Sequence, residues 1–533
     1  MFLRASLRWP LFRQLLLLSA ALLSGPALAL TPQQARSLVA GEAETRIEAL
    51  NSVLANADEK TVAFIQAMSD DAVKLTDTAV FVMKDGKGYD PVTGSEAAVP
   101  DSAEDLINNN QMRAELDAAL ASIKLFSAVT KERADAVKTL QSEPDEAKLP
   151  LVEKAYAAET DLSVKQALEH VRSAMLLGSA DKTRRLEAAT ALGASGTPAT
   201  KTLLIERQKV ETEADVKAAI AAALKTIEGR LAWGERLGVI FTGISLGSIL
   251  LLVALGLAIT YGLMGVINMA HGELMMIGAY ATYVIQNLFK AYLPSGFDAY
   301  VLVAIPASFL AAALVGAVME RSVIRWLYGR PLETLLATWG ISLVLQQAVR
   351  SLFGAQNVPV ENPAWLSGGV DMMSNLTLPF NRIAIIAFAV LVLAGVSAMI
   401  ARTRLGLFVR GVTQNRKMAA CMGVNTARID TYAFALGSGI AGLAGCALSQ
   451  VGNVGPDLGQ GYIVDSFMVV VLGGVGQLAG TVYAALGLGV LNKLLEGWQG
   501  AVLAKIIVLA FIVIFIQRRP QGIFALKGRS AEA

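Results

Sequence analysis

The feature that most constrains this chain is a succession of apolar segments in its C-terminal part. A helix that spans a membrane needs about 20 predominantly apolar residues, and in lipid a helix satisfies its own backbone hydrogen bonds. The sequence therefore predicts an all-α fold whose C-terminal part is a polytopic transmembrane helical bundle. The short segment 463–477 and its neighbour form either two spans or a re-entrant pair, which gives nine or seven full spans. The apolar segments are 239–263, 272–290, 300–320, 332–352, 382–400, 431–451, 463–477, 479–495 and 501–517.

Composition agrees with a membrane protein and excludes several other classes. Hydrophobic residues make up 54% of the 533 residues and charged residues 17%, whereas an average soluble chain carries about 25% charged residues. These values exclude a disordered chain and an ordinary cytosolic enzyme, and the net charge of +2 gives no reason to expect nucleic acid as a partner. With two cysteines and two histidines, the sequence predicts neither a disulfide framework nor a metal site, and no cofactor is expected.

The first 29 residues have the parts of a secretory signal peptide. Arg4, Arg8 and Arg13 form a basic leader, residues 15–23 are apolar, and residues 27–29 (ALA) are a small-residue cleavage site. The apolar core is short for a membrane span, so cleavage is favoured over a signal anchor. The mature chain is then delivered outside the inner membrane of a bacterium.

Residues 30–232 lack a segment long enough to span a membrane and repeat apolar residues at helical spacing. A weak internal repeat is visible, since residues 159–168 (ETDLSVKQAL) resemble residues 211–220 (ETEADVKAAI). Paired helices of this kind bury their apolar faces by stacking on one another, so we expect an exported α-helical, HEAT-like repeat domain. The helical pattern lapses into a loop at 89–94, and His170 is expected on a helix surface.

Clusters of basic residues orient the membrane segments, because Lys and Arg concentrate in cytoplasmic loops. With all three clusters inside, the number of crossings places the residues before the first span outside, where a signal peptide would deliver them. The sequence therefore predicts a periplasmic N-terminal domain and a cytoplasmic C-terminus. The clusters are Arg321, Arg325 and Arg330, then Arg402, Arg404, Arg410, Arg416, Lys417 and Arg428, and finally Arg518, Arg519, Lys527 and Arg529.

Glycine-rich stretches in the apolar part indicate close helix packing rather than a nucleotide site. The sequence from Gly473 to Thr481 lacks the lysine of a P-loop and lies between apolar segments. We interpret it as tight packing or as a helix break that lines a cavity. Two further small-residue faces suit a homodimer, a heterodimer or internal packing equally. These faces are Gly243 with Gly247, and Gly437 with Ala441 and Gly445.

A polar break at residues 268–273 (NMAHGE) interrupts the apolar part between its first two segments. Ionisable groups at membrane depth are costly and usually face a cavity or a partner. His271 and Glu273 are two residues apart and would not share a helical face, so a metal pair is not expected. Two interpretations stay open: a cytoplasmic turn in which Glu273 is stabilised near the start of the next helix, or a contribution to a translocation path.

The loop from Arg402 to Asp430 mixes cations with apolar residues and is too long for a tight turn. Its composition suits a short amphipathic helix. Such a helix either inserts into a groove of another protein or lies on the anionic inner leaflet of the membrane.

Residues 260–273 (TYGLMGVINMAHGE) resemble the signature of LivH-type permeases, the membrane subunits of branched-chain amino-acid ABC importers. The stretch RTRLG at 402–406, followed by MAACMGVN at 418–425, resembles the loop with which that family docks on its ATPase, although the leading acidic residue of related loops is missing. The resemblance covers about residues 236–528 and implies a transmembrane permease domain there. It also implies an ATPase-coupling loop that includes Arg402, Arg404, Gly406, Arg410, Ala419, Ala420, Gly423 and Asn425.

The long exported domain and the sequence QRRPQGIFALKGR at 517–529 resemble urea permeases of the UrtB type. The resemblance implies urea transport, with branched-chain amino acids as the alternative substrate. It further implies a heterodimer with a second permease subunit, two cytoplasmic ATP-binding subunits and a periplasmic substrate-binding protein, besides membrane lipid. Urea is neutral and needs hydrogen-bond donors and acceptors, so the candidate translocation path consists of Thr260, Asn268, His271, Glu273 and Gln450.

Two other classes compete with an importer permease, for which no enzyme activity and no ATP-binding motif of its own are expected. An ATP-independent channel or secondary carrier would need no docking loop. A membrane-anchored scaffold would not need so many apolar segments.

Overall fold

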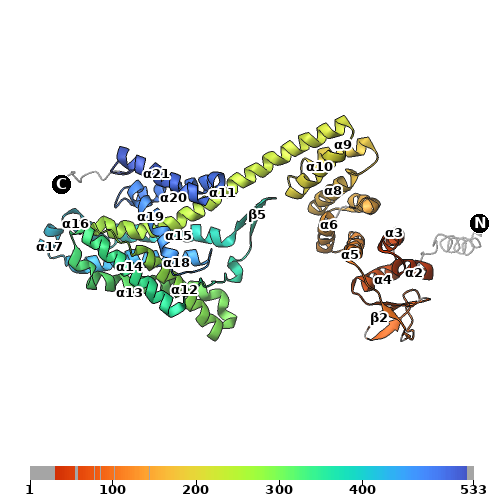
Figure 1. The fold of residues 1–533 in the computed structure, drawn as a ribbon, viewed down its shortest axis with the longest axis horizontal. Coiled ribbons are helices and arrows are strands. Elements are labelled where there is room, and N and C mark those ends of the chain that lie inside the picture. Colours follow the sequence, from red (N-terminus) through yellow and green to blue (C-terminus); the bar gives the residue numbers. More distant parts are fainter. Residues whose placement is uncertain are drawn as a thin grey trace, which may run out of the picture. The chain divides into compact units, whose positions relative to one another are not determined.

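The computed structural model describes residues 30–54, 58–76, 78–84, 86–100, 102–142 and 145–524. The predicted signal peptide at 1–29 therefore lies outside the described residues, as does the end of the chain from 525 on. The chain divides into two compact units, Met1–Leu231 and Ala232–Ala533 (Figure 1). Most of the described residues are helical, in agreement with the predicted all-α fold.

The first unit begins with helices and a small antiparallel sheet. Val73, Phe81 and Val82 are β-branched or aromatic, which suits strands, and Val73 pairs with Val82. Strands therefore replace the expected helical pattern between residues 73 and 105, in the order β3-β2-β1-β4. The elements are α2 (Pro32–Val39), α3 (Ala43–Leu54), α4 (Glu59–Ser69), β1 (Val73–Leu75), β2 (Val80–Lys84), β3 (Lys87–Tyr89), β4 (Glu104–Asp105) and α5 (Asn110–Lys124).

The rest of this unit is a series of helices that pack on one shared core. Leu140, Leu168 and Leu192, from three different helices, are fully buried in it. His170 is half-buried rather than on the surface, and its Nε2 lies 3.2 Å from Thr200 Oγ1. The helices are α6 (Thr130–Ser142), η1 (Glu146–Lys148), α7 (Leu149–Ala158), α8 (Leu162–Leu176), α9 (Lys182–Leu192), α10 (Pro198–Val210) and the start of α11 (Ala214–Met264).

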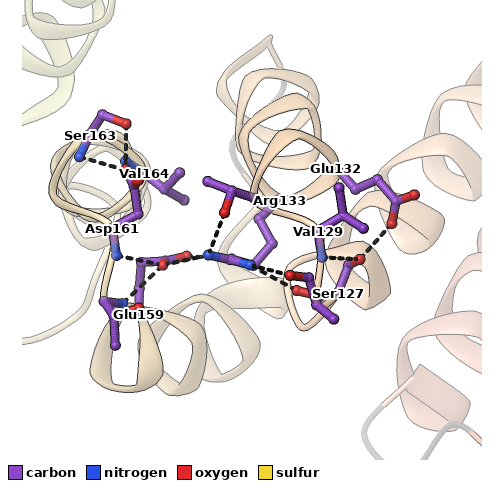
Figure 2. Close-up of polar contacts among 11 residues, drawn as sticks. Ser127, Val129, Glu132, Arg133, Glu159, Asp161, Ser163 and Val164 are labelled. Atoms are coloured by element: carbon purple, nitrogen blue, oxygen red, sulfur yellow. Dashed lines mark hydrogen bonds and ion pairs between the residues drawn. The ribbon is translucent and has the colours of Figure 1, made fainter.

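An arginine–glutamate pair connects these helices to their loops, and Figure 2 shows the first pair. Arg133 of α6 donates to both carboxylate oxygens of Glu159, at 2.8 and 2.9 Å, and to the carbonyl oxygen of Ser127 at 3.0 Å. Glu159 also accepts the backbone N–H groups of Thr160 and Asp161, both at 2.9 Å. The carboxylate therefore joins α6 to the turn that begins α8.

The same contacts recur, with the same sequence separations, 52 residues further along the chain (from 133 to 185). Arg185 of α9 donates to both oxygens of Glu211, at 3.0 and 3.2 Å, and to the carbonyl oxygen of Ser179 at 2.9 Å. Glu211 accepts the N–H groups of Thr212 and Glu213, both at 3.1 Å. The two carboxylate side chains are 3% and 1% exposed. The repeat seen in the sequence is therefore a repeat of buried contacts.

The stability of these repeats is expected to fall in acid. Burial alone would raise the pKa of Glu211, but the N–H groups of Glu213 and Thr212 and the guanidinium of Arg185 outweigh it and lower the pKa from 4.5 to about 2. Such a carboxylate stabilises the fold fully above its unfolded pKa, and this contribution is lost as the pH falls through the folded pKa.

We therefore expect thermal unfolding of α9 and α10 in the full-length protein, followed by hydrogen exchange, to be constant just above pH 4.5. It should shift to lower temperature between pH 4.5 and about 2. In Glu211→Gln this dependence should be reduced, and an unchanged acid profile in that variant would contradict the assignment.

Each of the nine apolar segments contains a helix in the structure. Among the described residues, six helical stretches are long and apolar enough to cross a membrane: Ala214–Gly262, Pro294–Ser322, Phe380–Arg402, Thr426–Ser449, Leu478–Gln499 and Ala501–Arg518. Leu458–Gly473 is a shorter apolar helix. The elements after α11 are α12 (His271–Tyr292), η2 (Pro294–Ala299), α13 (Tyr300–Ser322), η3 (Ile324–Leu327), α14 (Pro331–Phe353), η4 (Ala364–Leu366), β5 (Gly369–Met373), β6 (Leu376–Pro379), α15 (Phe380–Arg402), α16 (Arg404–Gln414), α17 (Arg416–Cys421), α18 (Thr426–Ser449), α19 (Leu458–Gly473), α20 (Leu478–Gln499) and α21 (Ala501–Arg518).

Helices α12, α13 and α18 lie side by side in the second unit (Figure 1). Glycines permit close approach to α18, since a Cβ at Gly445 would collide with the backbone of Met275, and one at Gly437 with the backbone of Gly256 in α11. Gly247 faces the backbone of α20 in the same way. The small-residue faces found in the sequence therefore serve internal packing in this structure.

The glycine-rich stretch after α19 is a helix break, as predicted. Gly474 and Gly476 have positive φ angles of 98° and 78°, which glycine adopts without steric cost. Gly473 packs directly against Gly480, and Gly476 lines a cavity of about 680 Å³. Both predicted roles, tight packing and a break beside a cavity, are therefore confirmed.

Candidate functional site

The polar break that interrupts the apolar segments lies between α11 and α12, and its polar side chains are buried. Asn268 Oδ1 accepts the N–H of Ala270 at 3.0 Å, which closes the turn before α12. His271 Nε2 lies 3.1 Å from the carbonyl oxygen of Val253 in α11. The hydroxyl of Thr260 donates to carbonyl oxygens of its own helix. The contact of His271 holds the start of α12 against α11.

Glu273 connects α12 to α14. Its Oε1 accepts hydrogen bonds from Ser342 Oγ at 3.0 Å and from Gln346 Nε2 at 2.7 Å. One turn nearer the start of α14, Thr338 Oγ1 accepts the N–H of Met269 at 3.2 Å. The polar break and the first turn of α12 are therefore both fixed to α14.

Our sequence analysis missed this polar face of α14. Thr334, Thr338, Ser342 and Gln346 recur at every fourth residue of the segment and are buried, and that spacing places them on one helical face. Polar groups inside a membrane bundle usually pair with one another. The spacing alone could therefore have identified α14 as the partner of Glu273.

Three buried polar atoms near the start of α12 have no hydrogen-bond partner among the described residues: Asn268 Nδ2, His271 Nδ1 and Glu273 Oε2. A buried polar atom without a partner costs free energy, so a ligand that bonded to it would recover that cost. The groups are an amide donor, an imidazole nitrogen and a carboxyl oxygen. They suit a small solute that both donates and accepts hydrogen bonds.

Gln450, the fifth residue of the candidate path, belongs to a different cluster. Its Nε2 donates to the Tyr300 hydroxyl at 3.1 Å, and that hydroxyl donates to the carbonyl oxygen of Glu361 at 2.7 Å. Asn381 Nδ2 donates to the carbonyl oxygen of Gln450 at 3.0 Å. Gln450 therefore ties the end of α18 to the starts of α13 and α15.

The predicted ATPase-coupling loop folds as the short helices α16 and α17. Gly406 is buried against the backbone of Ile400, where a Cβ would have no room. Arg410 donates to the carbonyl oxygen of Ile400 at 2.7 Å. The loop therefore begins as a fixed corner on the end of α15.

Much of the rest of this segment is exposed. Gly423 has a positive φ of 84°, and the side chain of Asn425 accepts the N–H of Arg428 at 3.1 Å at the start of α18. Exposed cations and large apolar side chains lie on one segment, which is typical of a surface that binds a partner. The exposed residues include Arg402, Arg404, Leu407, Met418, Ala420, Met422, Gly423 and Asn425, while Ala419 is half-buried.

The cavity of about 680 Å³ lies between α16 and the bundle. Ala258 of α11, Ile400 of α15 and Leu436 of α18 contribute to its mainly apolar walls, together with Leu407 and Arg410 of α16. Helix α16 is thus separated from α11 and α18 by unfilled space over part of its length.

An ion pair inside the same segment was also missed. Arg416, at the start of α17, pairs with Asp430 of α18 through both of its terminal guanidinium nitrogens. The Asp430 side chain is 3% exposed. Asp430 is the one acidic residue between positions 402 and 430 of the sequence, and this exception was the available signal.

Comparison with known proteins agrees with a membrane transport role. LivH of Salmonella typhimurium, a high-affinity branched-chain amino acid transport system permease protein, is 30% identical over 294 residues, which cover 53% of this chain and 93% of LivH. BraD of Pseudomonas aeruginosa, with the same description, is 29% identical over 285 residues and has the same two coverages. No solved structure matches the chain. Residues 239–516, more than half of the chain, match the model of one family, so the chain belongs to the branched-chain amino acid transport system permease component family.

Proposed function

We propose that the chain is the membrane-spanning permease subunit of an ABC importer, and that urea is the solute it carries. Family membership and the six helices able to cross a membrane support the permease assignment. The observation that carries the choice of solute is the kind of polar side chain buried in the second unit. Among its described residues these are hydroxyls, amides, one imidazole and three carboxyls, and none is Lys or Arg.

A neutral amide matches this set of groups better than an amino acid does. Urea presents N–H donors and a carbonyl acceptor, and it brings no charge that must be neutralised. The zwitterion of an amino acid brings a carboxylate, which in a desolvated path needs a cation or a helix N-terminus.

Branched-chain amino acids are the second candidate, because LivH and BraD are described as permeases for them. Residues 30–232 argue against this choice. The alignment uses 93% of LivH over 294 residues, so LivH has no room for a counterpart of this domain, which is the part that resembles urea permeases.

The start of α12 is the strongest candidate for the translocation path. Asn268, His271 and Glu273 each retain a buried polar atom without a partner among the described residues. The polar groups of Thr260 and Gln450 are satisfied within the protein, so these two are weaker candidates.

The proposed partners follow from the two ends of such a permease. Two cytoplasmic ATP-binding subunits would dock on the exposed face of α16 and α17, and a second permease subunit would complete the path. A periplasmic protein would deliver the solute on the side of residues 30–232, while the C-terminus would lie in the cytoplasm and lipid would surround the apolar faces. ATP binding would then displace α16 and α17 and shift the population between outward- and inward-open states.

Uptake of radiolabelled urea and leucine tests the proposal. The chain would be expressed in a host without its own urea permease, together with its cognate binding protein, second permease and ATP-binding subunits. We expect urea uptake that disappears when the ATP-binding subunits are omitted. Leucine uptake alone would support the second candidate, and uptake that persists without ATP-binding subunits would instead indicate a channel or secondary carrier.

A further inference from the structure

We propose that Arg416, Asp430 and Glu320 form a latch that carries displacements of the α16–α17 segment into α13 and α18. The inference rests on the proposed function, because it assigns how the segment that an ATPase would move is connected to the bundle. Each member of the latch comes from a different helix: Arg416 from α17, Asp430 from α18 and Glu320 from α13.

Two buried carboxylates stand at the centre of the latch. The side chains of Asp430 and Glu320 are 3% and 0% exposed. A buried carboxylate is strongly destabilising unless it is paired with a cation and with hydrogen-bond donors. The arginines that supply the charge, Arg416 and Arg325, are 43% and 35% exposed, so they reach inward from the surface of the unit.

Arg416 connects α17 to two elements at once. It pairs with Asp430 of α18 through both terminal guanidinium nitrogens. Its guanidinium also lies over the ring of Tyr328, with the central carbon 5.1 Å from the ring centroid. Tyr328 follows η3 and donates its hydroxyl to Glu320 at 3.0 Å. A displacement of α17 therefore acts on the start of α18 and on the turn after α13.

Glu320 closes the connection on α13. It accepts hydrogen bonds from Arg325 at 3.1 Å and from the hydroxyl of Thr431 at 2.7 Å. Thr431 is the sequence neighbour of Asp430, and Arg325 also donates to Thr431 at 3.1 Å. The end of α13 and the start of α18 are thus held together, so a force on Asp430 is transmitted to a pair of helices.

The other end of the segment is attached to a different helix. Gly406 and Arg410 fix the start of α16 to Ile400 at the end of α15. Between these two attachments, the cavity of about 680 Å³ leaves space beside α16 on the side of α11 and α18. A helix that is fixed at both ends and has free space on one side can move as a lever, and its movement changes the spacing between α15 and α18.

The number of solute molecules moved per ATP hydrolysed is the measurement that separates a latch from a merely structural pair. The complete transporter would be reconstituted in liposomes, with urea or leucine as the solute, whichever the wild-type protein carries. In Arg416→Gln and Asp430→Asn we expect ATP-binding subunits to remain bound and ATP hydrolysis to continue. Uptake per ATP should fall about tenfold, and Arg416→Lys, which keeps the charge but not the bidentate geometry, should restore part of it.

Arg330→Gln is the matched control. Arg330 also pairs with a carboxylate, that of Glu333, but both side chains are more than half exposed, so uptake per ATP should stay at the wild-type value. An unchanged ratio in both Arg416→Gln and Asp430→Asn would overturn the latch, and so would loss of the folded permease in Arg416→Gln, because that marks a purely structural pair. Absence of ATP-dependent uptake in the wild-type protein would instead overturn the proposed function.

Discussion

Replacing Gly445 with alanine is expected to separate α18 from α12 and to destabilise the membrane unit more than any other single methyl group added to a helix described here. A Cβ at this position falls within bonding distance of the carbonyl oxygen of Met275 and is also too close to the backbone of Ala279. The obstacle is backbone, so rotation of a side chain cannot relieve it. Overpacking typically costs about 1–3 kcal/mol, and we expect at least the upper end of that range.

Gly395→Ala provides the matched control for this prediction. Gly395 lies inside α15, and a Cβ there meets nothing within 4 Å, while alanine favours the helix by about 1 kcal/mol over glycine. The measurement is the melting temperature of each variant in detergent, with the yield of monodisperse protein. Equal melting temperatures for Gly445→Ala and Gly395→Ala would mean that the close contact between α12 and α18 is not present.

Arg185→Ala is expected to destabilise the helical repeats by about 3 kcal/mol, because removal of one partner leaves the buried carboxylate of Glu211 without its cation. The carbonyl oxygen of Ser179 loses a donor in the same variant. Amide exchange in α9 and α10 reports the local opening of this part of the chain. We expect it to become about 100-fold faster in the full-length protein.

The neighbouring residue supplies the control. Arg184 is exposed, so Arg184→Ala removes the same side chain from the same helix without uncovering a buried charge and should change exchange by less than about twofold. Similar exchange rates in the two variants would show that the pair of Arg185 and Glu211 does not stabilise the repeats.

Much of the membrane unit could be predicted from the sequence, because hydropathy has a direct physical cause. An apolar stretch of about 20 residues reports its own environment, and each of the nine stretches contains a helix. The sheet at 73–105 was missed because its strands are two to five residues long. Strands so short depend on their pairing partners, and a single segment does not reveal them.

The polar contacts of the candidate site were harder to predict than its location. The break at 268–273 stands out in an apolar sequence, but the partners of Glu273 come from a helix that begins 58 residues after it (from 273 to 331). Likewise, Arg416 was counted among the cations of an exposed loop. Its pairing with Asp430 depends on how α17 folds back on α18, which charge patterning alone does not determine.

The duplicated arginine–glutamate pair sets a rule for how the length of the first unit can change. Removal of residues 134–185 would leave Arg133 at a distance of 26 residues from Glu211, the separation found in both intact pairs. A deletion or insertion of any other size would place the arginine out of register with its carboxylate. A domain built in this way can be lengthened or shortened only by whole modules, like a ladder by whole rungs, and we expect its natural size variants to differ by multiples of that single step.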